Sequence, residues 1–331
     1  MTSDQASAPL ADRFGRRIDY LRISVTDRCD LRCSYCIPKG FCGFEEPANW
    51  LNFGEIERLI AVFGTLGVHR VRITGGEPLL RRDLPKLIAR LHRLRGIDDI
   101  SLSTNATQLD RHAIDLKAAG LSRINVSLDS LRRDRVERIT GRDCYDRILS
   151  GLTAGRRAGL APVKINMVVM RGVNDDEIDE MAVFCMSNGF VLRLIETMPM
   201  GKTGRSTQYL DLQPVRERLR KRFDLVDALV PGGGPARYLR SSDGGFNVGF
   251  ITPISQHFCE TCNRVRLSVD GTLYMCLGQD EKRNFRSLLR SGPTDDQIAS
   301  AIRTAIELKP ERHEFRELPG KILRVMSSTG G

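Results

Sequence analysis

The feature that most constrains the fold of this chain is a regular alternation of short apolar strands with amphipathic helices. The predicted strands cover residues 20–26, 70–74, 99–104, 123–128, 163–170 and 191–196. The predicted helices cover residues 54–66, 83–94, 108–119, 131–140, 145–158, 175–188 and 212–222. Strand–helix units in series build a parallel sheet with right-handed crossovers, either an open doubly wound sheet or a partial barrel.

The sequence predicts three parts. Residues 1–17 are expected to form a flexible N-terminal arm, residues 18–225 hold the strand–helix units, and residues 226–331 form a C-terminal region. In that region a Gly-Pro loop is followed by predicted strands at 246–252, 264–269 and 272–275 and a helix at 295–308. Local signals support the helix ends: Asn52 with Glu55 suits an N-cap, and Gly120 and Gly159 suit C-terminal caps.

Charge and cysteine content narrow the function. The formal net charge of +10 favours anionic partners such as nucleotides, nucleic acid or acidic proteins, although solvated basic faces would also account for it. No apolar run suits a membrane span, and residues 1–12 lack the apolar core of a signal peptide. We therefore expect a cytoplasmic protein, in which nine reduced cysteines serve metal binding or catalysis rather than disulfides.

A first cysteine cluster follows the first predicted strand. Cys29, Cys33 and Cys36 have C-x3-C-x2-C spacing, with Tyr35 between the second and third cysteines. Three thiolates on a cubane of four irons leave one iron open, and an open metal position can bind a substrate. A zinc loop or three buried thiols are the alternatives, but C-x3-C is unusual for zinc.

A second cysteine cluster stands near the end of the chain, where Cys259, Cys262 and Cys276 have C-x2-C-x13-C spacing. These cysteines suit another iron–sulfur cluster, or a zinc site completed by His257. Between them Arg264 and Arg266 share one face of a predicted strand. Two guanidiniums beside a metal site suit a phosphate group, the alternative being two surface arginines.

Other polar residues are less specific. Lys164 and Asn166 alternate with apolar residues on a predicted strand, so they face one side of it. A lysine that faces a barrel interior is costly unless it meets an anion. Cys42, Cys144 and Cys185 have no partner spacing, and we interpret them as structural.

Two motifs together resemble the radical S-adenosylmethionine (SAM) superfamily: the first cysteine cluster with Tyr35, and Gly75-Gly76-Glu77-Pro78 after the next strand. Leu21–Cys29, Arg72–Pro78 and Asn263–Arg266 further resemble the GTP 3′,8-cyclase family, which begins molybdenum cofactor biosynthesis. This second resemblance runs from about Arg22 to the C-terminus. It implies an α/β fold with a partial (β/α)6 TIM-type barrel and a C-terminal region carrying a second iron–sulfur cluster.

The family resemblance also implies the chemistry. The cofactors would be two [4Fe-4S] clusters and SAM, and the reaction would convert GTP to (8S)-3′,8-cyclo-7,8-dihydroguanosine 5′-triphosphate. The partners would be a flavodoxin- or ferredoxin-type electron donor and the next pathway enzyme, cyclic pyranopterin monophosphate synthase. Neither a membrane nor nucleic acid is implied, and a homodimer is compatible with the family.

The resemblance assigns roles residue by residue. It gives the SAM cluster to Cys29, Cys33 and Cys36, and the second cluster to Cys259, Cys262 and Cys276. It gives SAM contacts to Tyr35, Gly75, Gly76, Glu77, Ser127 and Met198. It gives GTP contacts to Arg22, Arg72, Ser103, Thr104, Lys164, Arg264, Val265 and Arg266. At positions 103 and 104 either hydroxyl could serve, and Met198 could equally be core filler.

The C-terminal tail, Ser327–Gly331, has two interpretations. Composition alone favours a frayed end, since chain termini are usually loose. The resemblance instead implies that Gly330 and Gly331 reach into the catalytic chamber, where Arg264 and Arg266 also act.

Two rival functions remain at the level of sequence. A radical SAM peptide-modifying enzyme usually has more C-terminal cysteines than the three found here. A zinc-bearing nucleic-acid-binding protein suits the positive charge. However, aromatic residues make up only 6% of the chain, and no basic stripe interleaved with aromatics is found.

Overall fold

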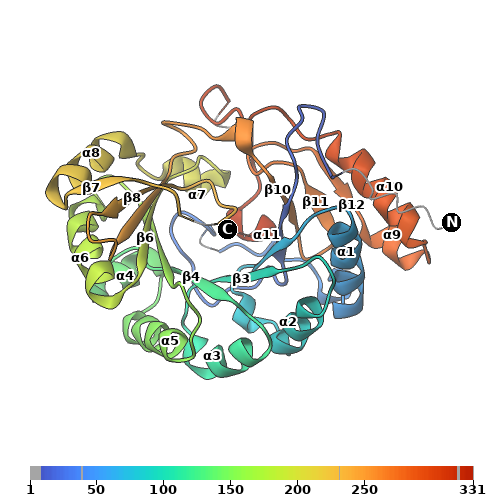
Figure 1. Ribbon diagram of the computed structural model, residues 1–331, viewed down its shortest axis with the longest axis horizontal. Helices are drawn as coiled ribbons and strands as arrows, with labels where there is room; N and C mark the ends of the chain where they lie inside the picture. Colours follow the sequence, from blue (N-terminus) through green and yellow to red (C-terminus); the bar gives the residue numbers. More distant parts are fainter. Residues whose placement is uncertain (1–8, 39, 231, 319–320, 331) are drawn as a thin grey trace.

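The computed structural model describes residues 9–38, 40–230, 232–318 and 321–330 of the chain. Their strands form one 12-stranded sheet in the order β12-β11-β10-β1-β2-β3-β4-β5-β6-β9-β8-β7 (Figure 1). The six central strands follow chain order and pair in parallel: β1 (Tyr20–Ser24), β2 (Arg70–Thr74), β3 (Asp99–Thr104), β4 (Arg123–Ser127), β5 (Lys164–Val169) and β6 (Val191–Glu196). The predicted partial barrel is therefore confirmed.

Helices cover the outside of the curved sheet (Figure 1). They are α1 (Phe53–Thr65), α2 (Leu84–His92), α3 (Leu109–Ala118), α4 (Arg133–Thr140), α5 (Tyr145–Arg157), α6 (Ile178–Asn188) and α8 (Leu212–Arg222). The short helix α7 (Gly201–Ser206) lies instead beside the C-terminal segment, where the Gly201 amide donates to the Ile322 carbonyl at 3.0 Å. The ends of the outer helices match the sequence signals. Asn52 and Glu55 form a capping box at the start of α1, and Gly120 and Gly159 follow α3 and α5 with positive φ angles of 98° and 74°.

The C-terminal region extends the same sheet at both edges. β9 (Asn247–Ile251) pairs in parallel with β6, and β10 (Arg264–Leu267) pairs in parallel with β1. Antiparallel strands follow on each side: β8 (Arg237–Ser241) and β7 (Leu225–Ala228) on one, β11 (Thr272–Tyr274) and β12 (Lys282–Asn284) on the other. The sheet is continuous across residue 225, so the domain boundary there stays a prediction.

The part of the expected flexible arm that the structure describes, residues 9–17, is packed rather than loose. Leu10 is buried and its carbonyl accepts from Ile18. Arg16 pairs with Asp12 at 2.6 Å and donates to the Cys259 carbonyl at 2.9 Å. A buried arginine with these partners anchors the arm against the C-terminal region, which a polar sequence alone did not reveal.

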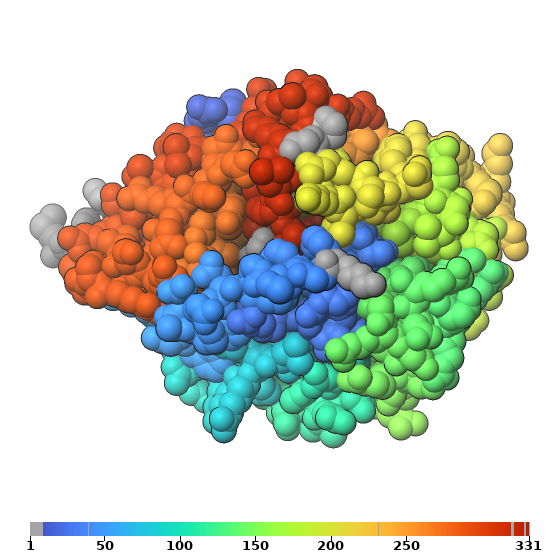
Figure 2. All heavy atoms as spheres, turned by 180° about the vertical axis from the view of Figure 1, so that it is seen from behind, coloured from blue at the N-terminus to red at the C-terminus, as the bar shows by residue number. Residues whose placement is uncertain are grey.

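The remaining helices are α9 (Arg286–Arg290), α10 (Asp295–Ile306) and α11 (Met326–Thr329). α10 packs beside α1 on the outside, whereas α11 lies within the ring of strands (Figure 1). From the opposite side, the last residues run between the yellow segment near α7 and the orange C-terminal strands (Figure 2). None of the helices in the described ranges is long and apolar enough to cross a membrane.

Candidate active site

A chamber opens at the carboxyl ends of the parallel strands, where parallel α/β folds place their ligands. Both cysteine triplets line it, although they are more than 220 positions apart in the sequence: Cys29, Cys33 and Cys36 from the loop after β1, and Cys259, Cys262 and Cys276 from the C-terminal region. Many of the predicted SAM and GTP residues also line it, namely Arg22, Tyr35, Arg72, Gly75, Gly76, Ser103, Thr104, Ser127, Met198, Arg264 and Arg266. Glu77, Lys164 and Val265 are buried behind this lining.

The glycine motif after β2 is bonded to the first cysteine loop. The Gly76 amide donates to the Thr26 carbonyl at 2.8 Å, and the Glu77 amide donates to the Arg28 carbonyl at 2.7 Å. A Cβ atom at Gly76 would lie 2.2 Å from the Arg28 carbonyl oxygen. Position 76 therefore has to be glycine so that the motif can pack against the backbone that carries Cys29.

The thiols of the first triplet need a metal to become thiolates. Burial raises the pKa of Cys29 and of Cys36 to about 12, and it raises the pKa of Cys33 well above its usual value. Thiolates are the form that binds iron, and a bound metal supplies the charge that removes the proton.

Glu77 of the glycine motif binds the Thr104 hydroxyl at the end of β3. Its buried carboxylate accepts from the Thr104 hydroxyl at 2.7 Å, the Asn105 amide at 2.7 Å and the Leu79 amide at 3.1 Å. Burial raises the pKa of Glu77 to about 7. The Thr104 hydroxyl is thus bonded to Glu77, although both Ser103 and Thr104 line the chamber.

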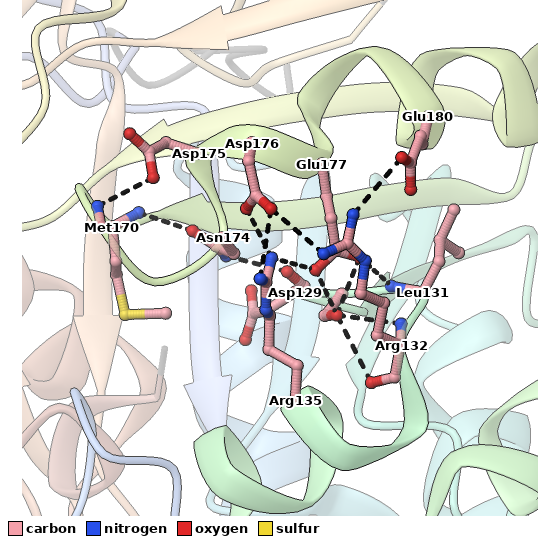
Figure 3. Close-up of polar contacts among 12 residues, drawn as sticks. Asp129, Leu131, Arg132, Arg135, Met170, Asn174, Asp175, Asp176, Glu177 and Glu180 are labelled. Atoms are coloured by element: carbon pink, nitrogen blue, oxygen red, sulfur yellow. Dashed lines mark hydrogen bonds and ion pairs between the residues drawn. The ribbon is translucent and has the colours of Figure 1, made fainter.

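Asp129 ties the loop after β4 to the first cysteine loop. Its carboxylate accepts from the Tyr35 hydroxyl at 2.7 Å and from the Val168 amide at 2.8 Å, and burial raises its pKa to about 6. The Asn174 side chain donates to the Asp129 carbonyl at 2.8 Å (Figure 3). It also donates to the Val168 carbonyl at 2.9 Å. These bonds fix the position of Ser127 relative to Tyr35.

Glu177, which is wholly buried, holds the following residues of this loop, Ser130 and Leu131. Its carboxylate accepts from the Ser130 hydroxyl at 2.7 Å and the Leu131 amide at 2.8 Å, and it pairs with Arg135 (Figure 3). Buried, fully bonded carboxylates of this kind stiffen a loop. The chamber wall near Tyr35 is therefore preformed.

The second triplet has a different electrostatic environment. Burial raises the pKa of Cys259 and of Cys276. Burial also acts on Cys262, but the Lys309 ammonium and the Arg264 guanidinium outweigh it and lower the pKa of Cys262 to about 7. One thiol of this triplet is therefore prepared as a thiolate by the surrounding protein.

The donor sets at both triplets fit iron–sulfur clusters. In the part of the chain that the structure describes, no three His, Cys, Asp or Glu side chains converge on a point that could hold a single metal ion. His313, rather than His257, lines the chamber beside the second triplet. Three thiols facing a chamber are the donor set of a [4Fe-4S] cluster with one open iron.

Arginines from several strands line the same chamber as the two triplets. The strand register places Arg22 of β1 directly between Arg266 of β10 and Arg72 of β2. Arg193 of β6 lines the same chamber. Burial, then Arg266 and Arg72, hold the pKa of Arg22 well below its usual value, and burial with neighbouring arginines lowers those of Arg193 and Arg266 to about 10. Cations crowded at such a cost indicate an anionic ligand.

Two further groups belong to this cationic site. Burial, then Arg193, Arg123 and Arg72, lower the pKa of Lys164 to about 7. Burial alone would raise the pKa of Tyr20, but Arg72 and the neighbouring guanidiniums bring it below its usual value. Within the described residues, buried polar atoms without a hydrogen-bond partner include Tyr20 Oη, Asn166 Oδ1, Arg193 Nε and Arg264 Nε. These atoms are available to a ligand.

The C-terminal tail enters the chamber. Met326 and Ser327 line it, and Thr329 is fully buried. The Gly330 carbonyl accepts from Arg266 Nη1 at 2.6 Å. The tail is thus packed up to Gly330, and its other predicted residue, Gly331, lies outside the described residues.

Sequence reasoning missed several residues of this site. Arg193 carries a visible signal, because it interrupts the apolar strand Val191–Glu196. Tyr20 begins β1 two residues before Arg22 and so shares its face. Asp129 and Lys309 carry no local signal, because their roles arise from contacts with distant segments.

A partial parallel barrel with a three-cysteine loop after its first strand and a glycine motif after its second defines a radical SAM enzyme. The model of the radical SAM superfamily matches residues 23–185, and the model of the molybdenum cofactor synthesis C domain matches residues 190–315. The GTP 3′,8-cyclase of Paracoccus denitrificans is 44% identical over 98% of this chain and 97% of its own length. The GTP 3′,8-cyclase of Erythrobacter litoralis is 45% identical over 98% of this chain and 100% of its own length. The chain therefore belongs to the GTP 3′,8-cyclase family.

Family membership gives the cofactors: SAM and [4Fe-4S] clusters, including a second cluster in the C-terminal region. Among solved structures, Streptococcus suis SuiB bound to S-adenosylmethionine matches with a TM-score of 0.63 and 17% identity, over 97% of this chain and 77% of that one. SuiB has also been solved with the precursor peptide SuiA. At this identity the likeness shows the fold alone, so the substrate has to be argued from the chamber.

Proposed function

We propose that this chain converts GTP to (8S)-3′,8-cyclo-7,8-dihydroguanosine 5′-triphosphate in molybdenum cofactor biosynthesis. The observation that carries this proposal is the arginine cluster in the chamber that the two cysteine triplets line, centred on Arg22 with Arg72 and Arg266 on either side. A nucleoside triphosphate supplies the charge that such a cluster needs, whereas a peptide supplies it only if it is acidic.

Each end of the chamber has its own part in this proposal. Cys29, Cys33 and Cys36 would hold the first cluster, with SAM against Gly76, Ser127, Met198 and the Tyr35 backbone. When bound, SAM and that cluster supply the one-electron chemistry that removes a hydrogen atom from the ribose. Cys259, Cys262 and Cys276 would hold the second cluster near the guanine.

The protein itself binds and aims the substrate. The triphosphate would lie against Arg22, Arg72, Arg193 and Arg264, whose charges it neutralises. Arg266 would contact the substrate with its remaining donors, because its Nη1 already binds the Gly330 carbonyl. The Ser103 hydroxyl would contact the substrate, since that of Thr104 is bonded to Glu77. Fixed donors of this kind keep the ribose in one orientation and leave little room for water.

The proposal also includes two protein partners, an electron donor and the enzyme that uses the product. An electron donor of flavodoxin or ferredoxin type would reduce the first cluster, and cyclic pyranopterin monophosphate synthase would take the product. A cytoplasmic location suits the cysteines, all nine of which are free thiols.

The proposal is tested by anaerobic incubation of the reconstituted protein with GTP, SAM and dithionite. We expect 5′-deoxyadenosine and the cyclised nucleotide to appear together, measured by liquid chromatography and mass spectrometry. ATP in place of GTP is the matched control, and iron and zinc are counted in the same sample. Bound zinc without iron, or SAM cleavage with no change in GTP, would contradict the proposal.

We expect GTP binding to weaken as the pH rises above about 7. The pKa of Lys164 is about 7 in the free protein, so the side chain loses its proton above that pH. A triphosphate favours the ammonium form, so binding raises this pKa and takes up a proton. Affinity should then fall by up to about tenfold for each pH unit above 7, because one pKa unit corresponds to 1.36 kcal/mol.

Calorimetry at pH 6.5, 7.5 and 8.5 measures this dependence. Lys164→Met should bind GTP more weakly at pH 6.5 and show a flatter pH profile, whereas Lys117→Met, at an exposed site on α3, should behave like the unaltered protein. The titration of GTP itself is common to all three proteins. Equal pH profiles in all three would exclude Lys164 as the titrating group.

A further inference from the structure

A buried lysine that the reaction does not use lies beside the second cysteine triplet. Lys309 follows α10 and is only 1% exposed. Its Nζ donates to the Met275 carbonyl at 2.6 Å and to the Arg264 carbonyl at 3.0 Å, and its charge favours the thiolate of nearby Cys262. An ammonium has three N–H donors, and two of them are used by these carbonyls.

The two carbonyls that Lys309 binds belong to the chain segments next to Cys262 and Cys276. Arg264 comes two residues after Cys262, and Met275 comes immediately before Cys276. Lys309 thus joins the two segments that carry these cysteines, which are separated by strands β10 and β11. A single buried charge holds both segments at a fixed distance from each other.

Two other cations hold the same region through carbonyl groups. Arg16 donates to the Cys259 carbonyl at 2.9 Å, and Arg324 donates to the carbonyls of Cys276 and Gln279 at 3.2 and 2.7 Å. The charge of Lys309 acts on the sulfurs of Cys262 and Cys276, and that of Arg16 acts on the sulfur of Cys259. Arg324, by contrast, holds the loop through its carbonyl contacts. This difference allows the effect of charge on the sulfur to be separated from that of merely holding the loop.

We propose that Lys309 is a positioning residue for the second cluster and raises the reduction potential of that cluster. The proposal rests on the assignment of Cys259, Cys262 and Cys276 as ligands. One-electron reduction of a [4Fe-4S] centre adds one negative charge, takes no proton and breaks no bond. A hydrogen-bonded ammonium beside a ligand sulfur stabilises that added charge, as net charge and hydrogen bonds to sulfur do in iron–sulfur proteins generally.

The test uses the full chain with Cys29, Cys33 and Cys36 all changed to Ala, so that a cluster can form only at the second triplet. Its reduction is followed by electron paramagnetic resonance during an anaerobic titration with dithionite and mediators. Into this background Lys309→Met removes the charge and Lys309→Arg keeps it. Arg324→Met is the control, because it removes a half-buried cation that holds the same loop through carbonyl contacts.

For Lys309→Met we expect the ratio of reduced to oxidised cluster at a fixed potential to fall about tenfold, which for one electron is a shift of about 59 mV to more negative values. Lys309→Arg should stay within about threefold of the background, and so should Arg324→Met. Equal shifts in Lys309→Met and Arg324→Met, or none in Lys309→Met, would overturn the proposal.

A loss of folding or of cluster assembly has its own control. If Lys309→Met holds no iron, Lys309→Gln, which is neutral but keeps two donors, is compared with Lys309→Arg; equal potentials would overturn the proposal. If the background protein with Lys309 intact binds zinc or no iron, the ligand assignment itself is wrong. The failure of the inference and that of the proposed function are thereby distinguished.

Discussion

Cys33→Ala is expected to abolish SAM cleavage, whereas Cys262→Ala is expected to keep SAM cleavage and lose the cyclised product. The two triplets lie on different segments and meet only across the chamber. Removing one ligand should therefore remove one cluster, about four iron atoms per chain, and leave the other. Iron content, 5′-deoxyadenosine and cyclised nucleotide are measured on the same anaerobic preparations.

Cys42→Ala is the matched control, because Cys42 is exposed and its thiol donates to the carbonyl of nearby Gly40 at 3.3 Å. It should keep the iron content and activity of the unaltered protein. If Cys262→Ala cyclised GTP at the normal rate, the second triplet would have no part in the reaction. If Cys33→Ala still cleaved SAM, the first cluster would have to lie elsewhere.

The central barrel could be predicted because its strands are rich in buried apolar and β-branched residues and alternate with amphipathic helices. Some of these helices also have clear end signals, such as the capping box of α1 and the glycines after α3 and α5. The strands β7, β8 and β12 were missed, and for β7 and β12 the local pattern is too weak. Lys282–Asn284 is exposed at every position, and Leu225–Ala228 buries only its first residue, so neither has the alternation that identifies a strand. These strands form because they pair with β11 and β8, which a local pattern cannot show.

In the active site, too, local motifs could be predicted from the sequence, whereas arrangements that depend on long-range contacts could not. The six cysteines and the glycine motif were found because their spacing along the chain is itself the signal. The arrangement of Arg266, Arg22 and Arg72 depends on β10 pairing with β1, a contact between segments more than 200 residues apart. The burial of Arg16 and Lys309 depends on the same distant packing. The sequence motifs therefore predicted the cofactor-binding residues. The burial and mutual contacts of the charged residues around them could be seen only in the tertiary structure.

Gly330→Ala is expected to leave both clusters and SAM cleavage intact and to reduce cyclised product to near nothing. Gly330 has a φ angle of 74°, and a Cβ atom there would lie 2.0 Å from the Thr74 hydroxyl oxygen. Thr74 ends β2, in the buried core of the sheet, and its hydroxyl is bonded to the Ile23 carbonyl, so it cannot move aside easily. The tail must shift instead, and Arg266 then loses the Gly330 carbonyl.

The matched control separates this shift from the general cost of a side chain at positive φ. Gly292 has a φ angle of 73° and nothing within 4 Å of the added Cβ, so Gly292→Ala has the same backbone strain, about 1 kcal/mol, without the collision. It should lower stability slightly and leave product formation unchanged. Deleting Gly330 and Gly331 should reproduce the effect of Gly330→Ala, because both changes remove the carbonyl from Arg266. A Gly330→Ala protein that forms product at the unaltered rate would instead mean that the end of the tail, although packed, takes no part in aiming the substrate.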